Sequence, residues 1–197
     1  MTTEYGFSDV RDQLLKDLRG AYPIKWEDFQ ATKVLGEGVF GSPKPHPNAV
    51  LNLFKAQNVR FAIPFAAYRA SIGGFLSLMS DEPGTVLPRR TLAFTIFGMH
   101  CIQTSASNTA RTIIYGGYLQ VCPDETCVLS VGINPIEKRM EALEKLYKSW
   151  LDEREGGMLT PPSLGHLCVK CTKTIEPTHT IWGSDFWEKY VKVFSGL

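Results

Sequence analysis

The sequence lacks a long apolar run and a surplus of charge of either sign. In 197 residues, no apolar stretch reaches the roughly 18 residues that a membrane-spanning helix needs. Lysine and arginine total 21, and aspartate and glutamate total 20, so the formal net charge is +1. Proteins dedicated to nucleic acids or membrane surfaces usually carry a basic surplus. The composition therefore argues against both classes, although it leaves room for a local basic patch.

The sequence also lacks the marks of secretion and the motifs of common hydrolases. No N-terminal segment combines a basic start, an apolar core and a small-residue cleavage site, and no Asn-x-Ser/Thr acceptor occurs. Neither a G-x-S-x-G nor an H-E-x-x-H string occurs. We therefore expect a cytoplasmic or nuclear protein that has no membrane segment, and hydrolase chemistry has no anchor in the sequence.

Two isolated patterns suggest chemistry, and neither has the partners that the chemistry needs. Residues 35–41 contain the G-x-G-x-x-G spacing of a phosphate-binding loop, but no V-A-I-K, H-R-D or D-F-G string accompanies it. His100 and Cys101 combine a base with a nucleophile, yet adjacent helical residues point about 100° apart. We interpret the glycine pattern as a loop and Cys101 as a packing residue.

Apolar residues recur at helical spacing along most of the chain, and strand patterns are weak. Segment 59–72 is apolar on almost every side, which predicts a buried helix with Pro64 in its first turn. The glycine- and proline-rich stretches 36–47 and 73–84 predict loops. These patterns indicate an all-α fold with irregular loops, and the length favours a single domain over residues 1–197.

Two further helices are predicted in the C-terminal half. One begins at Asn134, which is a good N-cap ahead of Pro135, and carries Met140 on its apolar face. The other repeats aromatic residues at positions 182, 186, 190 and 194. Pro177 precedes that repeat, and a proline removes a helical hydrogen bond. We therefore expect a break at Pro177 and a shorter last helix that is capped by Ser184.

Four of the five cysteines fall in two close pairs, Cys122 with Cys127 and Cys168 with Cys171. An odd cysteine count in an intracellular protein indicates thiols or metal ligands rather than a disulfide framework. Two thiolates separated by two to four residues can bind one ion, and two such pairs complete a tetrahedral Cys₄ site. The sequence therefore predicts that these four cysteines hold a structural zinc ion.

Other interpretations of the cysteine pairs stay open. His166 and His179 are possible replacement ligands, and Lys170 and Lys173 would partly offset the thiolate charge. The four thiols can equally be unrelated to one another. The C-x-x-C spacing at residues 168–171 also fits a redox pair, although no βαβ pattern accompanies it. A catalytic zinc is the least favoured, because no carboxylate or histidine cluster is evident.

Several motifs together resemble the region that follows the BTB/POZ domain in a large family of basidiomycete fungal proteins. The resemblance spans nearly the whole chain, and the chain contains no counterpart of the BTB domain itself. The motifs that carry it lie, in order, within Tyr5–Pro23, His46–Leu53, Ile63–Tyr68, Leu167–Cys171 and Trp187–Leu197. The resemblance implies BACK-like helices in residues 1–80 and a C-terminal helical part with the cysteine pairs in residues 85–197.

What the resemblance implies about function is a protein-interaction part, comparable to the BACK-type helices of cullin adaptors. We expect a non-enzymatic adaptor for a ubiquitin-ligase or transcriptional assembly, whose partner and oligomeric state are unknown. Trp26, Phe29 and Phe40 are candidate partner contacts, although core filling is the favoured role of all three.

Two other functional classes stay open at this stage. A zinc-stabilised nucleic-acid-binding or regulatory module would need a basic face, for which Arg89, Arg90 and Arg111 are the candidates. An enzyme of unrecognised class would need a pocket with perturbed titratable groups.

Overall fold

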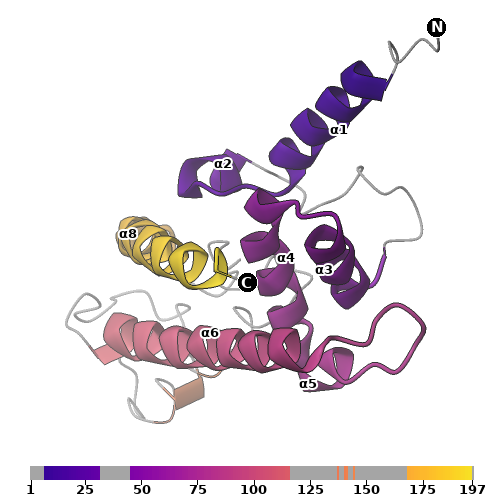
Figure 1. Cartoon of the computed structure of the whole chain (residues 1–197). Helices are drawn as coiled ribbons and strands as arrows, with labels where there is room; N and C mark the ends of the chain where they lie inside the picture. Colours follow the sequence, from indigo (N-terminus) through magenta and orange to yellow (C-terminus); the bar gives the residue numbers. More distant parts are fainter. Residues whose placement is uncertain are drawn as a thin grey trace, which may run out of the picture. The chain divides into compact units, whose positions relative to one another are not determined.

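A computed structural model describes residues 7–31, 45–115, 137, 140, 141, 144 and 168–196 of the chain. Within these ranges every regular element is a helix and no strand occurs, so the all-α prediction is confirmed. The elements of Figure 1 are α1 (Phe7–Ala21), α2 (Trp26–Ala31), α3 (Pro47–Ala56), η1 (Arg60–Ala62), α4 (Ile63–Ile72), α5 (Gly74–Leu78), α6 (Arg89–Tyr115) and α8 (Val169–Phe194).

The chain forms two compact units, and the first is assembled from residues that lie far apart in the sequence. It comprises Met1–Gly98 together with Glu188–Leu197, and the second unit comprises Met99–Trp187. Helices α6 and α8 therefore each contribute residues to both units. The single domain predicted from the sequence stays a prediction, as does its division near residue 80.

Helix α4 lies at the centre of the core of the first unit. Nine of its ten residues are buried, and Pro64 lies in its first turn, as the sequence predicts. The ring of Tyr22 meets Phe65 of α4 edge-on at 5.5 Å and Phe54 of α3 edge-on at 4.7 Å. Because each such side chain contributes about 1.5–3 kcal/mol on full burial, these contacts fix the end of α1 and the adjacent α3 against α4 (Figure 1).

The last turns of α8 close the same core. Tyr190 meets Tyr68 of α4 edge-on at 5.8 Å, and it stacks on Phe194 at 4.2 Å. Phe194 in turn contacts Phe94 of α6, with ring centroids 6.4 Å apart. Phe186, Tyr190 and Phe194 are all buried, so the aromatic register predicted for this segment is confirmed.

Pro177 lies inside α8 and does not end it, so the predicted break was wrong. The helix runs without interruption from Val169 to Phe194, and Ser184 is an interior residue rather than a cap. A proline has no N–H, so the carbonyl group of Lys173 loses its helical hydrogen-bond partner. Lys173 and Pro177 are both exposed, and water can therefore hydrate that carbonyl group. The buried residues on both sides of Pro177, such as Ile175 and Trp187, hold the helix together.

Two amphipathic patterns are more exposed than their apolar stripes suggest. α1 is helical, but Val10 and Leu14 on its stripe are exposed, and burial starts at the end of the helix with Ala21. In the helix predicted from Asn134, residues 137, 140, 141 and 144 are helical and exposed, including Met140. The cap residues Asn134 and Pro135 lie outside the described residues.

None of the helices in the described ranges combines the length and the apolar character needed to cross a membrane.

Candidate functional site

Polar side chains at the start of α3 and along one side of it hold the segment that leads from α5 to α6. His46 precedes α3, and Asn48, Asn52 and Lys55 follow at helical spacing. Each of these four side chains makes a hydrogen bond to a residue between 77 and 91. We call this set of contacts the polar seam. It fixes the 74–91 segment against α3.

Asn48 is the buried part of the polar seam. Its Nδ2 donates to the carbonyl oxygens of Ser77 at 3.0 Å and Leu78 at 3.3 Å. These are carbonyls of the last turn of α5, which have no partner within the helix. The Asn48 side chain is fully buried, and its Oδ1 has no hydrogen-bond partner among the described residues. Asn48 therefore serves as a donor that closes the end of α5.

Asn52 and Lys55 extend the polar seam toward α6. The Nδ2 of Asn52 donates to the carbonyl oxygens of Gly84 at 3.1 Å and Val86 at 2.9 Å. The Nζ of Lys55 donates to the Oγ1 of Thr91, which is buried, at 2.6 Å. The loop between α5 and α6 is therefore held at both its middle and its end.

His46 and Ser77 form a pair that superficially resembles a base and a nucleophile. The Nδ1 of His46 accepts a hydrogen bond from the backbone N–H of Asn48 at 3.2 Å, as an N-cap. In the neutral ring the proton then lies on Nε2, which is 3.2 Å from the Oγ of Ser77. Nε2 therefore donates to Ser77 and cannot accept its proton. The pair has a structural role, because a general base needs the opposite polarity.

The segment held by the polar seam exposes large apolar side chains. Leu76 is 87% exposed, Phe75 54% and Met79 52%, whereas Leu78 is buried. Met79 lies three and four residues after Leu76 and Phe75, so the spacing places all three on one side of the α5 turn. Val86, in the loop, is 60% exposed. We call Phe75, Leu76, Met79 and Val86 the apolar surface of the 74–91 segment.

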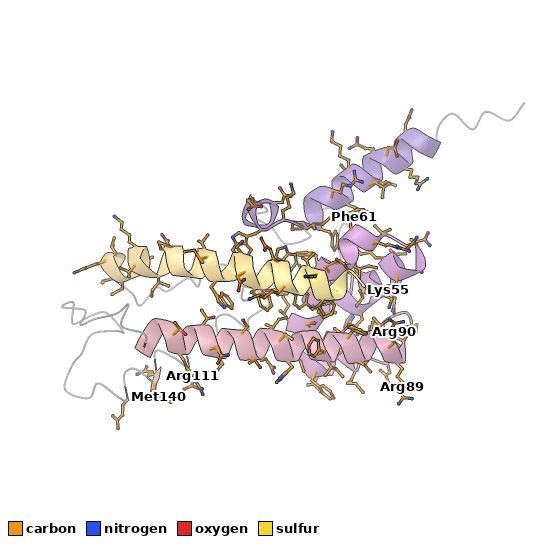
Figure 2. All side chains as sticks on the ribbon, turned by 60° about the vertical axis from the view of Figure 1, so that its left-hand side comes forward. Lys55, Phe61, Arg89, Arg90, Arg111 and Met140 are labelled. Atoms are coloured by element: carbon orange, nitrogen blue, oxygen red, sulfur yellow. The ribbon has the colours of Figure 1, made fainter. Side chains whose placement is uncertain are left out.

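Three cations gather where this segment enters α6 (Figure 2). Arg89 and Arg90 are the first two residues of α6, and both are exposed. Lys55 is half-buried beside them, and the Arg90 guanidinium lies 5.9 Å from the ring centre of Phe94. Burial first, and then the charge of Arg90, lower the pKa of Lys55. We call Lys55, Arg89 and Arg90 the basic cluster.

The zinc site predicted from the sequence is only partly within the described residues. Cys168 directly precedes α8 and is half-buried, and Cys171 lies in the first turn and is buried. The three-residue spacing of the pair is one at which two thiolates can bind the same ion. Cys122 and Cys127 lie outside the described residues. In the part of the chain that the structure describes, no three His, Cys, Asp or Glu side chains are grouped as metal ligands, and the Cys₄ site stays a prediction.

The other residues that the sequence analysis named as candidates lie in different places in the structure. Trp26 is buried, which confirms its core-filling role, whereas the side chain of Phe29 and all of Phe40 lie outside the described residues. Cys101 is half-buried, and burial raises the pKa of its thiol, which disfavours the nucleophilic thiolate. Arg111 lies near the C-terminal end of α6, in the second unit. The glycine pattern at 35–41 also lies outside the described residues.

Sequence reasoning missed both the polar seam and the apolar surface. The seam joins residues that are 29 to 36 positions apart, and polar contacts of this range leave no periodic signal. The apolar surface lies in a stretch that its glycines mark as a loop. The only available signal was the pair of asparagines four residues apart on a segment that is otherwise apolar.

Comparison of the chain with protein-family models, with curated proteins and with solved structures finds no match.

Proposed function

We propose that the chain is a non-enzymatic protein-interaction module that binds a partner protein through the apolar surface of the 74–91 segment. The observation that carries the proposal is the exposure of Phe75, Leu76, Met79 and Val86 on a segment whose backbone the polar seam holds in place. Phe75, Leu76 and Met79 lie on one turn, and exposed large apolar side chains grouped in this way are typical of interaction sites. The occupant is a protein segment with apolar side chains of its own.

The hydrogen bonds that hold the backbone of this surface in place support a role in binding, because exposure of apolar side chains alone would not. An interface loop that must be ordered on binding loses about 0.5–1.5 kcal/mol for each immobilised side chain. In this segment, Asn48 already fixes the backbone at the C-terminal end of α5, and Asn52 fixes the backbone of the loop that follows. Less conformational freedom is then lost when a partner docks.

The resemblance to the region after the BTB domain leads to the same class of function. We infer that the module takes part in an adaptor for a ubiquitin-ligase or transcriptional assembly. The charge balance of the chain agrees with a protein partner, because the sequence has no basic surplus. A zinc ion at the cysteine pairs would stabilise the module without taking part in the contact.

Site-specific photo-crosslinking tests the proposal in cells that express the chain. A benzophenone side chain at position 76 should crosslink one major protein. The same group at position 181, where Ile181 is 73% exposed in the second unit, serves as the control and should not crosslink it. The crosslinked protein is then purified and titrated with the chain. We expect the double variant Phe75→Ser, Leu76→Ser to bind it at least tenfold more weakly.

The proposal fails under two outcomes. One is crosslinking of the same proteins from positions 76 and 181, which would indicate non-specific proximity. The other is unchanged binding by the double variant, which would show that the contact lies elsewhere. Because both substituted residues are exposed, an unchanged circular dichroism spectrum and melting temperature separate loss of contact from loss of fold.

A further inference from the structure

The basic cluster has no counter-charge in the part of the chain that the structure describes. Lys55 bonds to a hydroxyl group and Arg90 lies over an aromatic ring, and neither they nor Arg89 make an ion pair with a carboxylate there. The first turn of α6 also contains no acidic residue. Lys55 and Arg90 therefore lie close enough to interact at the positive end of a helix of 27 residues, and Arg89 lies on the same first turn, on the side of α6 away from Lys55 (Figure 2).

This arrangement costs stability in the chain alone. A cation in the first turn of a helix is unfavourable, where an anion would contribute about 0.3–1 kcal/mol. Burial, and to a smaller extent the charge of Arg90, also lower the pKa of Lys55. Local arrangements that lower stability are expected at functional sites. The missing component is an anion.

Two side chains of the cluster, those of Lys55 and Arg90, are held in position to receive an anion. The Lys55 ammonium is fixed by its hydrogen bond to Thr91, and the Arg90 guanidinium is placed by Phe94. Figure 2 shows all three cations at the same end of α6, where the polar seam also attaches the 74–91 segment. The arginine guanidinium groups suit carboxylates, because the two groups can form two parallel hydrogen bonds.

We propose that the basic cluster binds an acidic segment of the partner protein, with carboxylate side chains at Lys55, Arg89 and Arg90. This inference rests on the proposed function, because it assigns a chemistry to the partner of the same 74–91 segment. The partner segment then combines apolar side chains, which contact the apolar surface, with two or three aspartate or glutamate side chains.

A protein segment fits the cluster better than a nucleic acid does. Nucleic-acid binders typically neutralise 6–10 phosphates, whereas this cluster has three cations. Arg111, the third arginine of a possible basic face, lies near the other end of α6. The residues beside the cluster in the chain are apolar, with Val86 exposed three residues before Arg89. An apolar neighbour suits a mixed acidic and apolar peptide and not a phosphate backbone.

The test uses a defined peptide, acetyl-Glu-Leu-Glu-Glu-Leu-Glu-amide, titrated into the ¹⁵N-labelled full chain at low salt. We expect saturable shifts of the amide signals of residues 55 and 89–91. Binding should weaken at least fivefold when salt is raised to about 0.2 M, because exposed charges are then screened. The variant Arg89→Glu, Arg90→Glu should bind at least tenfold more weakly, and the control Arg111→Glu should bind as the original chain does.

Two results would overturn the inference. Equal binding by the Arg89→Glu, Arg90→Glu variant and the original chain, or no saturable binding at low salt, would show that the cluster is not the site. Displacement of the peptide by a twelve-residue oligothymidine at lower concentration would assign the cluster to nucleic acid instead. Failure here leaves two results intact, namely a crosslink that forms from position 76 and not from position 181, and weaker binding by the Phe75→Ser, Leu76→Ser variant. Failure of the proposed function removes at least one of these results, so the two failures are distinguishable.

Discussion

The hydroxyl groups of Ser71 and Tyr190 lie 3.3 Å apart in the core of the first unit, although 119 residues separate them. The Oγ of Ser71 is also 2.8 Å from the carbonyl oxygen of Ala67 and 3.0 Å from that of Thr95. The single proton of Ser71 points to one of these carbonyls, so Tyr190 is the donor in the pair. This contact joins α4, α6 and α8 at one point.

The contact between Ser71 and Tyr190 leaves no room for a side chain at Gly98. A Cβ atom at position 98 would lie 2.7 Å from both Tyr190 Oη and Phe194 Cζ, and 2.9 Å from Ser71 Oγ. We expect Gly98→Ala to lower the free energy of unfolding by about 1–3 kcal/mol, because overpacking forces neighbours out of position. Urea denaturation monitored by circular dichroism measures the change.

Gly20 supplies the matched control for that substitution. It lies in α1, and a Cβ atom there would meet nothing within 4 Å. Gly20→Ala should raise stability by up to about 1 kcal/mol, because alanine favours the helix. Equal effects of the two substitutions would show that the junction is not tightly packed.

The two asparagines of the polar seam should differ in their importance. Asn48→Ala leaves the Ser77 and Leu78 carbonyls without their buried donor, and we expect a loss of about 2–3 kcal/mol. Asn52→Ala removes exposed hydrogen bonds, which water can replace, so its cost should stay below about 1 kcal/mol. Chemical denaturation of both variants gives the comparison. A larger loss at Asn52 would contradict the buried role of Asn48.

Tyr22 should make the first unit sensitive to alkali. Burial raises the pKa of Tyr22 to about 12, although the charge of Arg69 acts in the opposite direction. The unfolded chain loses this proton from about pH 10, so between about pH 10 and pH 12 the unfolded state binds fewer protons than the folded state. Stability then falls as the pH rises through this range, and Tyr22 contributes no pH dependence below it.

Thermal unfolding at a series of alkaline pH values measures that dependence. The variant Tyr22→Phe cannot titrate at this position, and its melting temperature should fall less steeply between about pH 10 and pH 12. Parallel declines in the two proteins would show that other groups account for the whole effect.

The zinc prediction has a direct chemical test. If Cys122, Cys127, Cys168 and Cys171 bind zinc, the purified chain should contain one zinc ion per molecule and should melt at a lower temperature with a chelator. Cys168→Ala should abolish the metal content and unfold the cysteine-bearing part, because metal binding supplies folding free energy there. Cys101→Ala is the control and should keep the metal. A chain that contains no metal and whose melting temperature does not change with a chelator would contradict the prediction.

Periodicity predicted the parts of the fold whose burial is continuous along one helix. Segment 59–72 is apolar on almost every side, and nine of the ten residues of α4 are buried. The aromatic repeat at 186, 190 and 194 predicts the stripe of α8 that packs in the core. In both cases the burial of each residue can be predicted from its type and its spacing along the helix.

The parts that were not predicted depend on contacts between distant segments. α5 follows Gly73 and Gly74, which suggest a loop, yet Gly74 has a φ of +81° and starts a helical turn directly after α4. Pro177 would break an isolated helix, and tertiary packing on both sides overrides that tendency. The basic cluster could not be predicted from the sequence, because Lys55 and Arg90 are far apart in the chain and come together only through the polar seam.

The assembly of the first unit from Met1–Gly98 and Glu188–Leu197 sets the order in which the chain can fold. During synthesis, α4 and the start of α6 emerge long before Tyr190 and Phe194, whose rings contact them. The unit therefore passes through a period in which Tyr68 and Phe94 lack their cover, and long-range closure of this kind slows folding and exposes apolar surface to aggregation. A nascent chain stopped before residue 188 would stay in that exposed state.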